Sequence, residues 1–162
     1  LGGGEVKPIS YRVFFGTTLA MVMLSINVVQ LFAGFGQSYP QSPLSLIITM
    51  PLIGIAVVIA TLPILRYRKA VEQHTKGPRP ERPSPFYAVR ALVLSRATAL
   101  AGAIFVGWHL GALIWLAVFS VAPIGPVTQT SFAFLSSIAM LIAGLIGQSN
   151  CKAPRDGDGE KV

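Results

Sequence analysis

Two long stretches of the chain contain no charged residue, one between Arg12 and Arg66 and the other between Arg96 and Lys152. A helix needs about 20 apolar residues to cross a hydrocarbon core about 30 Å thick, so each stretch has room for two crossings. Membrane β-strands are about half as long and alternate apolar with polar residues, which neither stretch does. Helices also satisfy their own backbone hydrogen bonds within lipid. The pattern therefore predicts an all-α polytopic membrane protein with four transmembrane helices.

The predicted helix boundaries follow from residues that interrupt helices. Clusters of Gly, Pro and Ser at 36–43 and 121–126 divide each uncharged stretch in two. We expect a four-helix transmembrane domain over residues 1–150, arranged as two hairpins with a connecting loop at 66–90. Its transmembrane helices are predicted at about 12–35, 44–65, 91–119 and 130–148.

Charge determines the expected orientation in the membrane. The chain is 52% hydrophobic and only 12% charged, whereas soluble domains carry about 25% charged residues. The basic residues behind its net charge of +7 lie near the N-terminus, in the loop at 66–90 and in the tail. Cytoplasmic loops are enriched in Lys and Arg, and the turns at 36–43 and 121–126 carry no charge. We therefore expect the loop and both termini in the cytoplasm, and no nucleic acid partner.

Local signals refine the two ends of this picture. Ser84 followed by Pro85 is typical of a helix N-terminus, so the third helix is expected to begin there, before it enters the membrane. Residues 151–162 lack apolar side chains apart from isolated positions and are expected to form a disordered cytoplasmic tail. The single cysteine, Cys151, excludes an internal disulfide and is expected to be an inert thiol.

Small side chains recur every four residues along the helix predicted at 91–119. Such stripes allow transmembrane helices to approach closely. The pattern fits packing inside the four-helix bundle, and the alternative is docking against a partner membrane protein. The residues of this predicted helix-packing stripe are Ser95, Ala99, Ala103, Gly107 and Gly111.

His109 is the one ionisable side chain expected deep in the membrane, about 20 Å beyond Arg96 along the helix. Intramembrane ionisable residues are candidates for functional sites. Asn27 and Gln30 are expected at a comparable depth in the first helix, so we predict a buried hydrogen bond between His109 and one of these two carboxamides. A proton relay or haem ligation is the alternative, but the transmembrane stretches contain no Asp or Glu, and the second histidine, His74, lies in the loop.

Five basic residues border the predicted cytoplasmic loop. The side chain of Arg96, one to two turns into the membrane, is long enough to reach back to the headgroups. We expect the group to contact anionic lipid headgroups, at about 1 kcal/mol for each residue near the surface, or acidic groups of a partner. The group consists of Arg66, Arg68, Lys69, Arg90 and Arg96.

Motifs that carry catalysis do not occur in this sequence. We find no nucleophile–base arrangement, no carboxylate pair in the transmembrane stretches, no metal-ligand cluster and no glycine-rich phosphate loop. The sequence therefore predicts a protein that is not an enzyme and that needs no cofactor or metal.

One part of the chain resembles a known family. Residues 85–97 follow the pattern P-x-x-A-x-R-x-x-V-L-S-R-A, residues 107–111 read G-W-H-L-G, and Cys-Lys-Ala-Pro at 151–154 is followed by an acidic residue. These features resemble an uncharacterised family of four-span actinobacterial membrane proteins, often encoded near folate-pathway genes. The resemblance implies a bacterial plasma membrane protein, and the family pattern accepts Tyr or His at position 109.

Two functional hypotheses follow. The first is an accessory or assembly subunit of a larger plasma membrane complex, such as a respiratory assembly, that acts through helix–helix packing with a membrane-protein partner or a further copy of itself. The second is a small-molecule or lipid transporter component that uses His109 and a second helix bent by Pro51 and Pro63.

Overall fold

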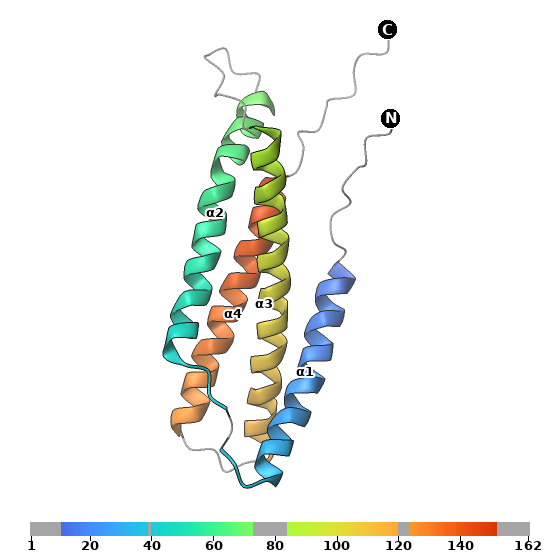
Figure 1. The fold of residues 1–162 in the computed structure, drawn as a ribbon, viewed down its shortest axis with the longest axis vertical. Helices are drawn as coiled ribbons and strands as arrows, with labels where there is room; N and C mark the ends of the chain where they lie inside the picture. Colours follow the sequence, from blue (N-terminus) through green and yellow to red (C-terminus); the bar gives the residue numbers. More distant parts are fainter. Residues whose placement is uncertain (1–10, 39, 73–83, 120–123, 152–162) are drawn as a thin grey trace.

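The computed structural model describes residues 11–38, 40–72, 84–119 and 124–151. Within them the chain forms four α-helices and no β-strand (Figure 1). All four helices are long and apolar enough to cross a membrane, which confirms the predicted all-α fold with four candidate spans. The helices are α1 (Tyr11–Gly34), α2 (Leu44–Glu72), α3 (Pro85–Phe119) and α4 (Ile124–Asn150).

The helices lie side by side with α1 and α2 at opposite edges of the bundle (Figure 1). The most extensive packing joins α3 to α4, followed by α1 against α3 and α2 against α4, with a lighter contact between α2 and α3. Of the two predicted hairpins, α3 and α4 pack against each other, whereas α1 and α2 are consecutive but share no packed face. The helix α1 is therefore attached to the rest of the bundle through α3.

A glycine-dependent turn ends α1. Gly36 adopts a left-handed backbone with φ of 67°, which a residue without a Cβ adopts at little cost. The Gln37 N–H donates to the Phe32 carbonyl and the Gly36 N–H donates to the Ala33 carbonyl, both at 3.0 Å. This is the Schellman arrangement, which satisfies carbonyls that the helix end would otherwise leave free. The predicted turn after the first helix therefore begins where expected.

The predicted loop at 66–90 is shorter in the structure because both flanking helices extend into it. The helix α2 continues to Glu72 through residues such as Arg66 and Lys69, which favour helix. The helix α3 begins at Pro85, and the Tyr87 N–H donates to the Ser84 hydroxyl at 3.3 Å as an N-terminal cap. Residues 73–83 and the tail predicted to be disordered, beyond Cys151, lie outside the described residues.

The last helix begins earlier than predicted. It starts at Ile124 and includes Pro126, whereas the sequence pattern suggested a turn through residue 126 and a start near 130. Pro126 lies in the first helical turn, where backbone N–H groups have no intrahelical partner, so its missing N–H costs nothing there. The two prolines of α2, Pro51 and Pro63, lie inside a helix that continues through both.

Candidate functional site

His109 lies at the centre of a buried polar cluster on α3. Its side chain is 0% exposed. The ring Nδ1 lies 2.8 Å from the Phe105 carbonyl oxygen and 3.0 Å from the Ser137 hydroxyl, and Nε2 lies 2.8 Å from the Ser42 hydroxyl. Because a carbonyl oxygen only accepts hydrogen bonds, we assign the ring proton to Nδ1. A neutral imidazole then accepts the Ser42 hydroxyl proton at Nε2.

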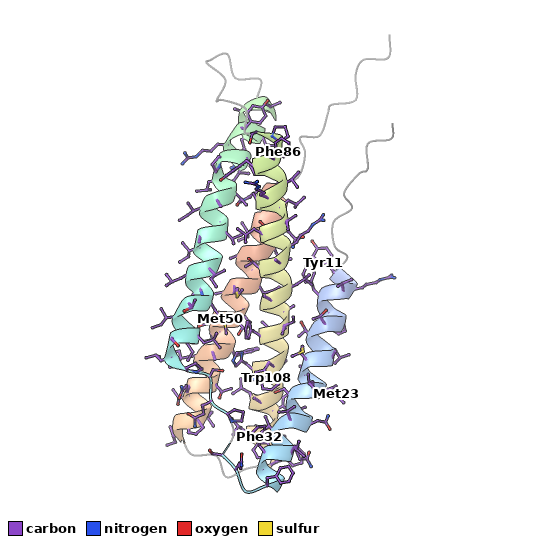
Figure 2. All side chains as sticks on the ribbon, in the orientation of Figure 1. Tyr11, Met23, Phe32, Met50, Phe86 and Trp108 are labelled. Carbon is purple, nitrogen blue, oxygen red and sulfur yellow. The ribbon has the colours of Figure 1, made fainter. Side chains whose placement is uncertain are left out.

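The cluster reaches every part of the bundle near this depth. The Gln129 side-chain N–H donates to the Ser42 carbonyl at 2.7 Å. The Ser137 hydroxyl donates to the Ala133 carbonyl at 2.7 Å and lies 3.4 Å from the sulfur of Met50 on α2 (Figure 2). A buried polar group without a partner is costly, and here each partner comes from a different segment. The cluster therefore ties the α1–α2 connection, α2 and α4 to α3.

The expectation that Asn27 and Gln30 are buried and reach His109 is wrong. Both side chains are exposed on the outside of α1, and Asn27 donates to the Met23 carbonyl of its own helix at 2.7 Å. The face of α1 that packs on α3 contains Ser25 and Val29. At about 100° per residue, Asn27 points about 200° away from Ser25. Depth along the membrane was comparable, but the rotation of α1 decided the partner, and Ser42 of the connection took that place.

The predicted stripe on α3 is buried over its whole length, but its two halves face different helices. Positions four residues apart advance about 40° beyond a full turn, so the stripe rotates by about 160° over its sixteen residues. Near its start, Ser95 lies against Gly147 of α4. Near its end, Gly111 lies against Val22 of α1. The stripe Ser95, Ala99, Ala103, Gly107 and Gly111 is thus occupied by helices of the same chain.

Glycines set the closeness of these contacts. A Cβ on Gly102 would lie 2.6 Å from the Leu141 Cα, and one on Gly111 would lie 2.6 Å from the Val22 carbonyl oxygen. Neither backbone atom can move aside without shifting a helix. The short separation also allows side chains of α1 to reach the α3 backbone, as the Ser25 hydroxyl donates to the Trp108 carbonyl at 2.7 Å (Figure 2).

The basic residues divide into two groups. Arg66, Lys69 and Arg90 are exposed, at the end of the bundle where α2 finishes and α3 begins. Arg68 and Arg96 are half-buried. Arg68 donates from Nη1 to the Ser149 carbonyl at 2.7 Å, which places a cation at the C-terminal end of α4, where it is favoured by the helix dipole.

A second polar group, which sequence reasoning missed, links the helices at this end. The Asn150 side chain donates to the Thr61 hydroxyl at 3.1 Å, and both residues are buried. The Tyr87 hydroxyl donates to the Ala60 carbonyl at 2.6 Å, from α3 to α2. The signal in the sequence was a lone carboxamide at the end of an apolar helix, but its partner lies 89 residues away in the chain.

The single cysteine follows Asn150 directly and is half-buried. Burial raises the pKa of the Cys151 thiol, and the nearby Arg68 cation opposes this by lowering the pKa. Burial has the larger effect, so the thiolate, which is the reactive form, is disfavoured at neutral pH.

A regular outward-facing stripe on α1 was also missed. Its members follow one another at intervals of four, three, four, three and four residues, and all are exposed. The two glycines have no atom within 4 Å of the position that a Cβ would take. We call this set, with Met23 in its middle (Figure 2), the α1 outer face: Gly16, Ala20, Met23, Asn27, Gln30 and Gly34.

Within the described part of the chain, no three His, Cys, Asp or Glu residues lie together in a way that could hold a metal ion. No curated protein and no solved structure matches the chain significantly. A family profile does match, over residues 14–155, which includes most of α1 and all of the other three helices. Because this match covers most of the chain, the protein belongs to the family described as protein of unknown function (DUF3180).

Proposed function

We propose that the protein is a non-catalytic, multi-pass protein of the bacterial plasma membrane that acts as an accessory or assembly subunit of a larger complex, such as a respiratory assembly. In this proposal it contributes no reacting group and docks through helix–helix packing. The termini and the loop after α2 lie in the cytoplasm, as the positive-inside rule favours.

The α1 outer face carries this proposal. The helix α1 packs on α3 alone, and its opposite side combines exposed small residues with the carboxamides Asn27 and Gln30. Small residues and interhelical hydrogen bonds are the features that associate helices in membranes. A face of this kind supports contact with another helix more than contact with lipid chains.

The geometry of His109 favours this subunit function over a transporter component. Both of its ring nitrogens are engaged by Ser42, Ser137 and the Phe105 carbonyl, an arrangement that suits a structural role in the bundle. We further propose that the exposed Arg66, Lys69 and Arg90 bind anionic lipid headgroups, each contributing about 1 kcal/mol near the membrane surface.

Affinity purification of the tagged protein from its own membranes in a mild detergent, with quantitative mass spectrometry, tests the proposal. We expect a membrane protein of a different sequence to co-purify at a fixed stoichiometry. A matched pair of variants locates the contact: Ala20→Trp on the α1 outer face should lower the recovery of this partner, whereas Ala56→Trp on the exposed side of α2 should not. Recovery of the chain with no heterologous protein at fixed stoichiometry would contradict the subunit function.

A further inference from the structure

We propose that the α1 outer face pairs with the same face of a second copy of this chain, in a parallel dimer whose two-fold axis is normal to the membrane. Asn27 and Gln30 make hydrogen bonds to their counterparts across this axis. The inference rests on the proposed function, because it assigns the docking face of that proposal to a second copy, so that a larger complex would bind the dimer.

The two carboxamides are in an unfavourable place if only lipid surrounds them. Asn27 is the seventeenth residue of a 24-residue helix, so it lies well inside the membrane. It satisfies one N–H through the Met23 carbonyl, and no described residue hydrogen-bonds the Gln30 carboxamide. Hydrocarbon provides no hydrogen-bonding partner, and an unpaired polar group there is costly. A partner that brings its own polar groups removes this cost.

A second copy is the occupant that fits this chemistry. A carboxamide carries both donors and an acceptor, so two identical carboxamides can pair reciprocally. All copies insert into the membrane with the same orientation, and a two-fold axis normal to the membrane therefore makes the two α1 helices parallel and in register. Each residue of the face then meets its own counterpart, as polar core residues do in parallel coiled coils.

The spacing and the space around the face suit such a pair. Intervals of four and three residues produce the left-handed crossing of about 20° that is common between membrane helices. Gly16 and Gly34 leave open space at both ends, so two backbones can approach closely there. Arg12, one turn before Gly16 and exposed, lies at the membrane boundary, where its long side chain can turn toward headgroups.

The position of α1 in the bundle leaves this face accessible. The helix α3 covers the opposite side, α2 shares no packed face with α1, and α1 lies along one edge (Figure 1). The outward side of α2 has a different character, since it presents large apolar residues suited to lipid: Ile48, Leu52, Ile55 and Ile59.

Disulfide cross-linking in native membranes tests the pairing. In a background with Cys151→Ala, the variant Met23→Cys places a thiol at the centre of the α1 outer face. Ile55→Cys is the matched control, because it lies eleven residues from the outer end of α2, as Met23 does from that of α1, and is similarly exposed, 55% against 58%. Under mild oxidation we expect the Met23→Cys dimer fraction to exceed that of the control at least fivefold.

Adding Asn27→Leu and Gln30→Leu to Met23→Cys should lower this dimer fraction at least fivefold while leaving the thermal unfolding of the protomer unchanged, because neither carboxamide contacts another helix of the chain. A dimer fraction equal to that of Ile55→Cys, or one that the two leucines do not change, would overturn the proposal. A cross-link from Met23→Cys to a protein of different sequence would also overturn it and would leave the subunit function standing. A cross-linked dimer that co-purifies with no other protein would instead support the pairing and contradict the subunit function.

Discussion

The helices α1 and α3 both carry small and polar residues at regular intervals, but these residues meet different surroundings. On α3, His109 and the glycines are buried against α1, the connection and α4. On α1, Asn27, Gly16 and Gly34 face outward, away from every other helix of the chain. The same residue types therefore hold the protomer together in one helix and remain available in the other.

The comparison shows that a small-residue stripe indicates helix contact without indicating which contact. The interior helix of a bundle satisfies its stripe with neighbours from its own chain. A peripheral helix can satisfy only one face in this way, so a second patterned face is left for another molecule. Matched substitutions on α3 and α1 provide direct ways to test this difference.

The largest expected effect separates the two polar residues that sequence reasoning had paired. His109→Ala removes a fully buried ring and leaves the Ser42 hydroxyl and the Phe105 carbonyl without their partner, so it should lower the free energy of unfolding by about 3 kcal/mol. Asn27→Ala, which breaks only a bond within α1, should change that of the monomer by less than about 0.5 kcal/mol. Equilibrium unfolding in detergent micelles at dilutions that maintain the monomer measures both, and equal effects would contradict the comparison.

The next effect compares two glycines. A Cβ on Gly107 would overlap the Thr18 carbonyl oxygen and lie 2.7 Å from the Met21 Cβ, so Gly107→Ala should destabilise the protomer by about 2 kcal/mol. Gly16→Ala meets no atom within 4 Å and should be neutral or stabilise α1 by up to about 1 kcal/mol through helix propensity. The same unfolding measurement applies, and a destabilising Gly16→Ala in the monomer would show that the α1 outer face is covered by its own chain.

A smaller effect is expected for the hydroxyl that links α1 to α3. Ser25→Ala removes the hydrogen bond to the Trp108 carbonyl, and interhelical hydrogen bonds in membranes contribute about 0.6 kcal/mol on average. Ser149→Ala is the control, because its hydroxyl bonds only to Ile146 of its own helix. Double-mutant analysis with Gly107→Ala would show whether the two act on one interface, and additivity would indicate that they do not.

The smallest effect concerns reactivity at the packed end of α4. Because burial raises the pKa of the Cys151 thiol, the thiolate forms at higher pH than in an exposed cysteine, and alkylation at pH 8 should be slower than that of a model thiol. Arg68 lowers this pKa, so Arg68→Gln should raise it further and slow the reaction again. Alkylation rates measured from pH 7 to 10 test the sign, and a faster reaction in Arg68→Gln would contradict it.

Much of the fold could be predicted from local properties. The absence of charge over two long stretches determined the number of helices, and Ser84, Pro85 and Gly36 act on the residues beside them, so their signals were readable. The boundaries that failed, beyond residue 65 in α2 and before residue 130 in α4, lie where no local residue forbids helix and where only membrane depth had suggested an end.

The candidate site was harder to predict, because it depends on rotation. The sequence by itself determined that His109, Asn27 and Gln30 lie at similar depths, since depth follows from position along a helix. Only the tertiary structure decided that His109 pairs with Ser42 and Ser137, while the two carboxamides point outward. A helix turns about 100° at each residue, so the residues that a side chain meets depend on which neighbour packs against which face, and packing between distant segments sets that choice.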